Sequence, residues 1–173
     1  MASFGRSAAA AYAPAVRRPN SITMASTHGY VSLQLTETTV SPGGSAVDLL
    51  WIASIEVNQF VGEITFVASS ELISQFARQL EDLAKGGTPT SKLECGMVAE
   101  DEQISYFLCQ IDRNKDGGPC IAQVSIGAAG PEGLMHRLHV GIKLELMAVA
   151  AFCRQIRDVL VLGNGTATLG NRS

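Results

Sequence analysis

The sequence contains no long apolar run, little charge and few aromatic residues. Its 173 residues include 17% charged and 6% aromatic side chains, with a single tryptophan. No stretch approaches the roughly 18 consecutive apolar residues that a membrane-spanning helix needs, so we expect no such helix. The 46% hydrophobic content excludes a wholly disordered chain. The length fits one domain, since domains usually have about 100 to 150 residues.

Acidic residues are missing from the first 36 positions, where Arg6, Arg17 and Arg18 are the charged side chains. From Glu37 onward 16 acids stand against 10 bases, so the body of the chain carries about −6. This balance argues against direct nucleic-acid binding and favours a basic protein partner. Ordinary solubility is the simpler explanation of the same charge.

Branched apolar residues are scarce at both ends of the chain. Residues 1–27 are rich in Ala, Arg and Ser, and residues 163–173 are rich in Gly, Asn and Thr. Such segments bury too little surface to offset their ordering entropy. We therefore predict a disordered leader over 1–27, one domain over 28–162 and a disordered tail over 163–173. The leader's composition also permits an organelle transit peptide, and Met24 is an alternative start.

Motifs for catalysis and metal binding are missing as well. The four cysteines, at positions 95, 109, 120 and 153, form no Cys-x-x-Cys pair and indicate reduced thiols in a cytoplasmic protein. We find neither a nucleophile elbow nor a glycine-rich phosphate loop. His136 and His139 lie three apart on a predicted strand, so they point to opposite faces and do not share a metal. We expect no enzymatic activity, no metal and no cofactor.

One loop resembles part of a cation site. Asp112, Asn114, Asp116 and Gly117 match the opening of a calcium loop, but position twelve is Gln123 where a bidentate Glu is needed. A hairpin turn accounts for the same residues, and cation binding at this turn stays open.

The sequence does contain a regular succession of strand and helix patterns. Apolar residues alternate with polar ones in the strand-like segments and recur every three or four residues in the helical ones. The pattern predicts an α+β fold with an antiparallel sheet of about seven strands in the order βββα-ββββα, and with both helices on its apolar face. The predicted strands cover residues 30–35, 47–57, 60–67, 92–98, 103–112, 120–127 and 134–144. The first predicted helix begins after an N-cap at Ser69 or Ser70 and ends at Lys85, and the second covers residues 145–160.

The two predicted helices have related sequences. Residues 76–83 read FARQLEDL and residues 152–159 read FCRQIRDV, with four identities and two conservative apolar changes. Each helix follows a set of strands. An internal duplication explains this match, and convergence of two amphipathic helices explains it equally well.

The layout from position 30 to position 160 resembles the WapI-like immunity proteins, or a related uncharacterised bacterial family of the same layout. The features that carry the resemblance are the segments WIASIEV at 51–57, FVGEITF at 60–66, SELISQF at 70–76 with Leu80 to Leu83, and IKLEL at 142–146. The resemblance implies a bacterial, cytoplasmic, non-enzymatic protein that binds and neutralises a cognate toxin domain, often a basic nuclease. The competing hypothesis is a small-ligand or regulatory module with an apolar pocket between sheet and helices.

The candidate partner-binding residues are charged side chains that folding does not need. The first group is the acidic cluster at a predicted hairpin tip, and the second is the solvated face of the sheet. They are Glu100, Asp101 and Glu102 in the cluster, and Glu56, Glu63, Arg137 and Lys143 on the sheet face.

We predict that Trp51 lies in the core beneath the helices. Replacing it with Ala should then reduce the free energy of unfolding by about 3 to 5 kcal/mol, because a large cavity remains. Urea denaturation of the two proteins measures this difference. Native fluorescence typical of a water-exposed indole would contradict the prediction.

Overall fold

The structure is a computed structural model, and it describes residues 21–26, 29–40, 47–58, 60–99, 102–114, 118–130 and 135–170. Within these residues strands and helices follow one another as β1 (Ser21–Ser26), β2 (Tyr30–Val40), β3 (Val47–Val57), β4 (Phe60–Ser69), α1 (Ser70–Lys85), β5 (Thr90–Ala99), β6 (Glu102–Asp112), β7 (Cys120–Ala129), β8 (Met135–Leu144), α2 (Leu146–Leu162) and β9 (Gly165–Gly170). The predicted α+β class is confirmed.

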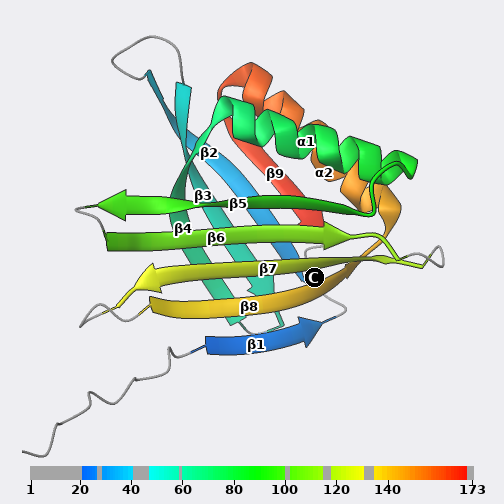
Figure 1. Ribbon diagram of the computed structural model, residues 1–173, viewed down its shortest axis with the longest axis horizontal. Helices are drawn as coiled ribbons and strands as arrows, with labels where there is room; N and C mark the ends of the chain where they lie inside the picture. Colours follow the sequence, from blue (N-terminus) through cyan, green and yellow to red (C-terminus); the bar gives the residue numbers. More distant parts are fainter. Residues whose placement is uncertain are drawn as a thin grey trace, which may run out of the picture.

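All of these strands belong to one sheet, in the order β1-β8-β7-β6-β5-β4-β3-β2-β9. The pairs are antiparallel except β1 with β8, which is parallel. Between β4 and β5 a single register pair, Val67 with Gly96, joins the strands. The sheet turns sharply there, so that β2, β3, β4 and β9 form a first arm that crosses the second arm of β5 to β8 at a steep angle (Figure 1).

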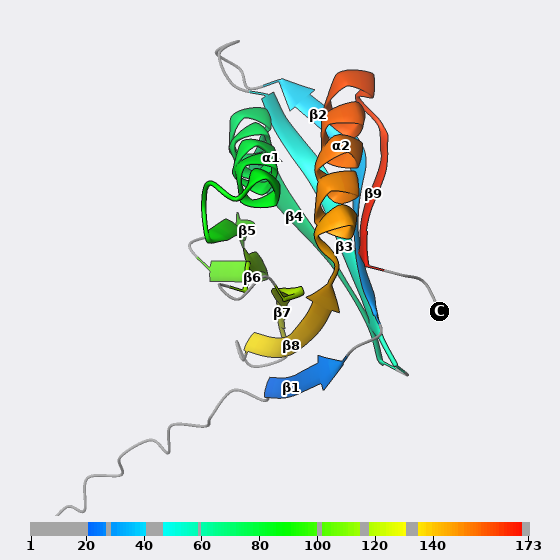
Figure 2. The same cartoon turned by 90° about the vertical axis from the view of Figure 1, so that its right-hand side faces the viewer.

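The helix boundaries have clear local causes. Ser69 caps α1, because its Oγ accepts a hydrogen bond from the Leu72 N–H at 3.2 Å. Gly86 ends the helix with φ of 90°, a conformation that glycine adopts without strain. The second helix ends in the same way at Gly163, with φ of 70°. Both helices lie side by side in the angle between the two arms (Figure 2).

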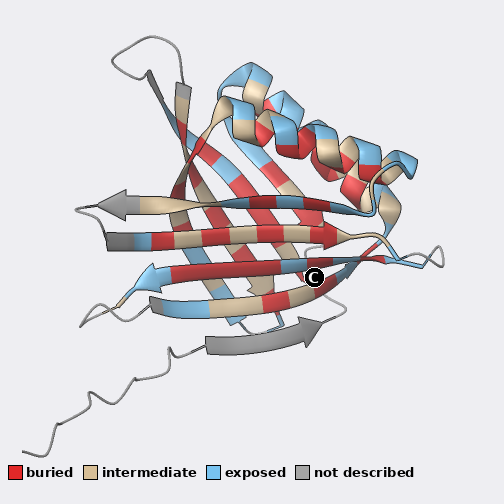
Figure 3. Cartoon of the chain, in the orientation of Figure 1, coloured by how far each residue is buried: buried red, intermediate tan, exposed pale blue. Residues whose placement is uncertain are grey.

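The core occupies this angle and draws on both arms and both helices. Trp51, on β3, is fully buried, as predicted. Phe66 on β4 stacks on Phe107 of β6 with ring centroids 4.7 Å apart, which ties the first arm to the second. Buried positions alternate with partly buried or exposed ones along the central strands (Figure 3). The alternation predicted from the sequence therefore identifies the inner face of the sheet.

The second half of the chain repeats the first around the contact between the helices. Phe76 and Phe152 hold equivalent positions, and their rings meet edge to face with centroids 6.5 Å apart. Further along, Arg157 of α2 forms an ion pair with its equivalent on α1, Glu81. The two helices run in opposite directions (Figures 1 and 2), so these equivalent residues meet where an approximate twofold axis passes between the helices.

A second pair of contacts supports the repeat. Gln79 of α1 accepts a hydrogen bond from the backbone N–H of Lys92 at 3.3 Å, and Gln155 of α2 accepts one from Thr168 N–H at 2.7 Å. Each glutamine thus holds the strand that follows its helix, 13 residues further on. The strand β5 then pairs with β6, and β9 pairs with β2. The structure therefore favours duplication over convergence.

The strand count differs from the prediction at both ends of the chain. The tail was expected to be disordered, and this is wrong for Gly165–Gly170, which forms β9 with Ala167 and Leu169 buried. Its alternation is only six residues long, but Gln155 and β2 supply the partners that order it. Within the leader expected to be disordered, Ser21–Ser26 pairs with β8 as β1.

No helix in the described part of the chain is long and apolar enough to cross a membrane.

Truncating a buried side chain of β9 tests its structural role. We predict that Leu169→Ala reduces the free energy of unfolding by about 2 to 4 kcal/mol, because Leu169 is fully buried. Thr166→Ala, at an exposed position of the same strand, should change it by less than about 0.5 kcal/mol. Chemical denaturation of both variants is the measurement, and equal stabilities would show that β9 contributes nothing.

Candidate functional site

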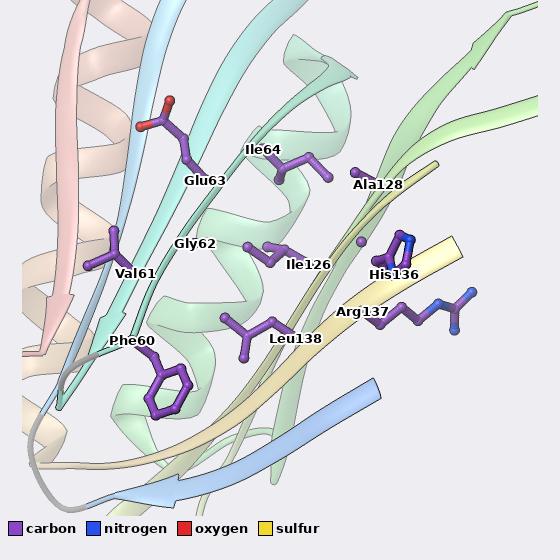
Figure 4. A pocket seen from close by; sticks show the side chains of 11 residues that line it. Phe60, Val61, Gly62, Glu63, Ile64, Ile126, Ala128, His136, Arg137 and Leu138 are labelled. Atoms are coloured by element: carbon purple, nitrogen blue, oxygen red, sulfur yellow. The ribbon is translucent and has the colours of Figure 1, made fainter. Parts of the chain in front are cut away.

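An apolar recess opens between the two arms, and strands alone line it. It has a volume of about 360 Å³ and lies between β4 on one side and β7 and β8 on the other. Ile64, Ile126 and Leu138 point into the gap (Figure 4). No residue of α1 or α2 lines it, so the recess marks the end of the core that the helices leave open. An apolar pocket was expected between the sheet and the helices, and this pocket lies beyond them.

The glycine at position 62 allows the arms to approach at the recess. A Cβ added at Gly62 would lie 2.6 Å from Ile126 Cδ1 and 3.0 Å from Leu138 Cδ2. Both of these atoms are ends of side chains, and Ile126 is nearly fully buried. Gly62 thus sets the depth of the recess, and a side chain there would occupy it.

Two apolar side chains stand in solvent beside the recess. Phe60 is 44% exposed and Val61 is 73% exposed, at the start of β4. They follow the β3–β4 turn, in which Asn58 has φ of 56°. Figure 4 shows Val61 pointing away from the gap that Ile64 and Leu138 enter. The recess and these two side chains form one apolar surface, which we call the open end: Phe60, Val61, Gly62, Ile64, Ile126 and Leu138.

Two of the predicted binding residues, Glu63 and Arg137, flank the recess from opposite arms. Both point away from its interior (Figure 4). Glu63 Oε2 accepts a hydrogen bond from Ser54 Oγ at 3.0 Å, and on the same arm Glu56 Oε2 accepts one from Tyr30 OH at 2.9 Å. The carboxylates therefore have fixed positions on the outer surface of the first arm.

The side chain of Arg137 extends from β8 across the second arm to Tyr106 of β6. Its guanidinium carbon is 4.7 Å from the centre of the Tyr106 ring, a cation–π distance. The residue between them in the sheet is Gly127, which has no side chain to obstruct the contact. Tyr106 OH in turn donates to Glu94 Oε1 at 3.3 Å.

This row of charges continues to Lys92, whose Nζ lies 2.5 Å from Glu94 Oε2. The hydrogen bond from Lys92 holds the pKa of Glu94 below its usual value, and the same bond raises the pKa of Lys92. Partial burial is the first reason why the pKa of Tyr106 is raised. The ion pair of Lys92 and Glu94 therefore stays charged at neutral pH. Glu94 holds Tyr106, which in turn holds the guanidinium of Arg137 in place.

The remaining predicted binding residues are not brought to the recess. Lys143 is exposed near the far end of β8, opposite Ile121 of β7. Glu100 and Asp101 lie outside the described residues, and for Glu102 only its backbone place at the start of β6 is described. The four sheet-face residues were expected to share one surface, whereas the crossing of the arms divides them between two.

The loop that resembles a calcium site lies partly outside the described residues, which omit 115–117. The carboxylate of Asp112 accepts hydrogen bonds from Gln110 Nε2 at 3.1 and 3.0 Å. No group of three or more potential metal ligands occurs among the residues that the structure describes.

The structure brings together a serine and a histidine that sequence reasoning had left apart. Ser125 of β7 and His139 of β8 are register partners, and Ser125 Oγ lies 2.5 Å from His139 Nδ1. His136 faces the recess, so the two histidines do lie on opposite faces, as predicted. In the described part of the chain no carboxylate is hydrogen-bonded to His139, and the pair does not line the recess.

All four cysteines are free thiols; Cys109, Cys120 and Cys153 are buried, and Cys95 is half-buried. Burial raises the pKa of Cys95 and of Cys109 to about 12. Cys153 is buried at the contact between the helices, where its Sγ donates to the Ala77 carbonyl oxygen at 3.1 Å. Thiols that are protonated and buried do not act as nucleophiles.

Comparison with known proteins adds little. No protein-family model and no curated protein matches the chain. Among solved structures the fold is similar to that of WHY3 from Arabidopsis thaliana, with a TM-score of 0.40 and 12% identity over 75% of this chain and 78% of that one. A likeness at this level supports no argument about function. The resemblance to WapI-like immunity proteins is not addressed by these comparisons and stays a prediction.

The open end was missed because its parts are far apart in the sequence. The signal that was available is Gly62, which interrupts the apolar alternation that continues through Ile64 and Phe66. A glycine within a strand often marks a close approach of another segment. The identity of that segment, Ile126 and Leu138, depends on the crossing of the two arms.

The buried thiols give a direct chemical test. At pH 8 a thiol with a pKa of about 12 has roughly 10³-fold less thiolate than one with the ordinary value of 9.0. We predict that Cys95 and Cys109 react with a disulfide reagent at least a hundredfold more slowly, to order of magnitude, in the native protein than in urea. Rapid modification of Cys109 in native buffer would contradict its burial.

Proposed function

We propose that this chain is a non-enzymatic binding protein that contacts a protein partner through the open end of its sheet. The observation that carries the proposal is the apolar recess of about 360 Å³ beside the exposed Phe60 and Val61. Contiguous apolar surface is costly to leave in water and commonly marks an interaction site. An apolar side chain of the partner would enter the recess, and Phe60 and Val61 would be covered around it.

The charge around the open end supports a partner with basic groups. Glu63 and Glu56 lie on the outer surface of the first arm, and the body of the chain is acidic from Glu37 onward. Such carboxylates raise the rate of association with a basic surface more than the final affinity. A toxin domain, including a basic nuclease, is the partner that the immunity-type resemblance implies, and we retain it as the specific form of the proposal.

The place of action that we propose is the cytoplasm. Four free cysteines, two of them with strongly raised pKa, suit a reducing compartment. We propose no catalytic step, cofactor or metal for this role.

A small apolar ligand is the second candidate, because about 300 to 1,000 Å³ is the usual volume range of ligand pockets and the recess falls within it. Native mass spectrometry of the protein purified from its own host distinguishes the two. A small bound mass that is lost on filling the recess would favour the ligand, whereas a bound polypeptide favours the protein partner.

Filling the recess tests the proposal. Gly62→Leu places a side chain between Ile126 and Leu138, whose ends can move aside, so unfolding should become easier by no more than about 2 kcal/mol. Affinity capture from the host, quantified by mass spectrometry, should then lose the proteins that the wild-type chain retains. Val61→Ser, at a position 73% exposed and therefore harmless to folding, should weaken capture of the same proteins.

The control is Ile121→Ser, which removes an exposed apolar side chain of β7 outside the recess. It should retain the wild-type set of proteins. A set that is the same for all four baits would contradict a role of the open end in binding.

A further inference from the structure

The outer face of α2 exposes large apolar side chains at both ends of the helix. Met147 is 79% exposed in the first turn, and Val161 and Leu162 are 85% and 69% exposed in the last. Scattered apolar residues are normal on protein surfaces. These residues, however, lie on one helix, and the repeat within the chain provides a reference for them.

The outer face of α1 serves as the reference, because it is the face of the first helix that is equivalent to the outer face of α2. Through the match of Phe76 with Phe152, each α2 position has an equivalent 76 residues earlier. On α1 the equivalents of four apolar positions of this α2 face are polar. The α1 residue equivalent to Met147 is Glu71, and those equivalent to Ala150, Ala151 and Val161 are Ser74, Gln75 and Lys85. Arg154 and Asp158 have the identical residues Arg78 and Asp82 as their equivalents.

The four changes all replace a polar side chain by an apolar one. Positions 147, 150, 151, 154, 158, 161 and 162 recur at three- and four-residue spacing and therefore form one stripe along the helix. Its ends are apolar and its centre carries the pair Arg154 and Asp158. We call these residues the α2 stripe.

We propose that the α2 stripe is the interface with a second copy of this chain, in which the two α2 helices pack antiparallel about a twofold axis. The order of the charges at the centre of the stripe supports this arrangement. An antiparallel pair that crosses at the level of residue 156 sets Arg154 of each copy opposite Asp158 of the other. In a twofold interface the same surface of each copy meets itself, so each charge must find its opposite on the other copy. The pair Arg154 and Asp158 meets this requirement.

The same register matches large side chains with small ones. It sets Val161 opposite Ala151 of the second copy and Leu162 opposite Ala150, with each contact formed twice. Facing positions of unequal size interdigitate well. In this arrangement Met147 lies at the level of Gly165, at the start of β9, which has no side chain. The α1 sequence, with Glu71 and Lys85 at the ends and Ser74 and Gln75 between them, allows no such packing.

The interface is small. A helix of 17 residues is about 26 Å long, so one helix pair buries less than the roughly 1,600 Å² of a standard interface. We therefore expect a reversible dimer with a dissociation constant on the order of micromolar rather than a permanent one. The open end belongs to strands and stays outside this interface, so the two surfaces are independent.

Sedimentation equilibrium of the full chain, from about 1 to 200 μM protein, measures the association. The wild-type protein should shift from the monomer mass to twice that mass. The variant Met147→Glu/Val161→Lys gives α2 the residues that α1 carries at these positions. It should weaken association by about tenfold or more without changing the circular dichroism spectrum. Ile121→Ser is the matched control and should associate as the wild type does.

Charge exchange tests the antiparallel register. Arg154→Asp alone and Asp158→Arg alone each set like charges opposite one another and should weaken the dimer. The double variant Arg154→Asp/Asp158→Arg restores opposite charges in both places and should restore it. A wild-type chain that stays monomeric throughout the range would overturn the proposal, as would a dimer that the Met147/Val161 variant leaves intact. Failure of the double variant to recover would overturn the proposed register.

Discussion

The packing of α1 against α2 is the constraint on which the rest of the structure depends. Phe76 meets Phe152 edge to face, and Glu81 pairs with Arg157, so equivalent residues of the two halves contact one another close to the approximate twofold axis of the repeat. Each helix then fixes the strand that follows it through Gln79 or Gln155. Because β5 and β9 are added to the sheet in this way, the helix pair sets the angle at which the two arms cross.

The crossing of the arms also produces the open end. The helices fill the angle between the arms over part of its length, where Trp51, Phe66 and Phe107 are buried. Beyond the helices, only strand side chains lie between the two arms. Because Gly62 has no side chain, Ile126 and Leu138 can approach it closely. A recess results there, flanked by Glu63 and Arg137. The proposed binding surface is thus a consequence of a helix pair that is shorter than the sheet it covers.

Local patterns in the sequence were sufficient for the class of fold. The first helix has its cap at Ser69, one of the two predicted cap residues, and its stop at Gly86, and both act within one turn, so the limits of α1 could be read from the sequence. β9 was missed because its order comes from Gln155 and β2, which its own six residues do not reveal. The site was harder still. The pairing of Arg137 with Tyr106 and of Ser125 with His139 depends on strand register, and the recess depends on the crossing of arms that share a single register pair.

The central claim is that the open end is the surface that binds. Hydrogen exchange of the full chain, alone and with the protein recovered by affinity capture, tests it most directly. The account predicts slower exchange on binding at residues 60–64 and 136–138, with no change along the exposed face of α1. Protection confined to other segments, with 60–64 and 136–138 unaffected, would contradict it.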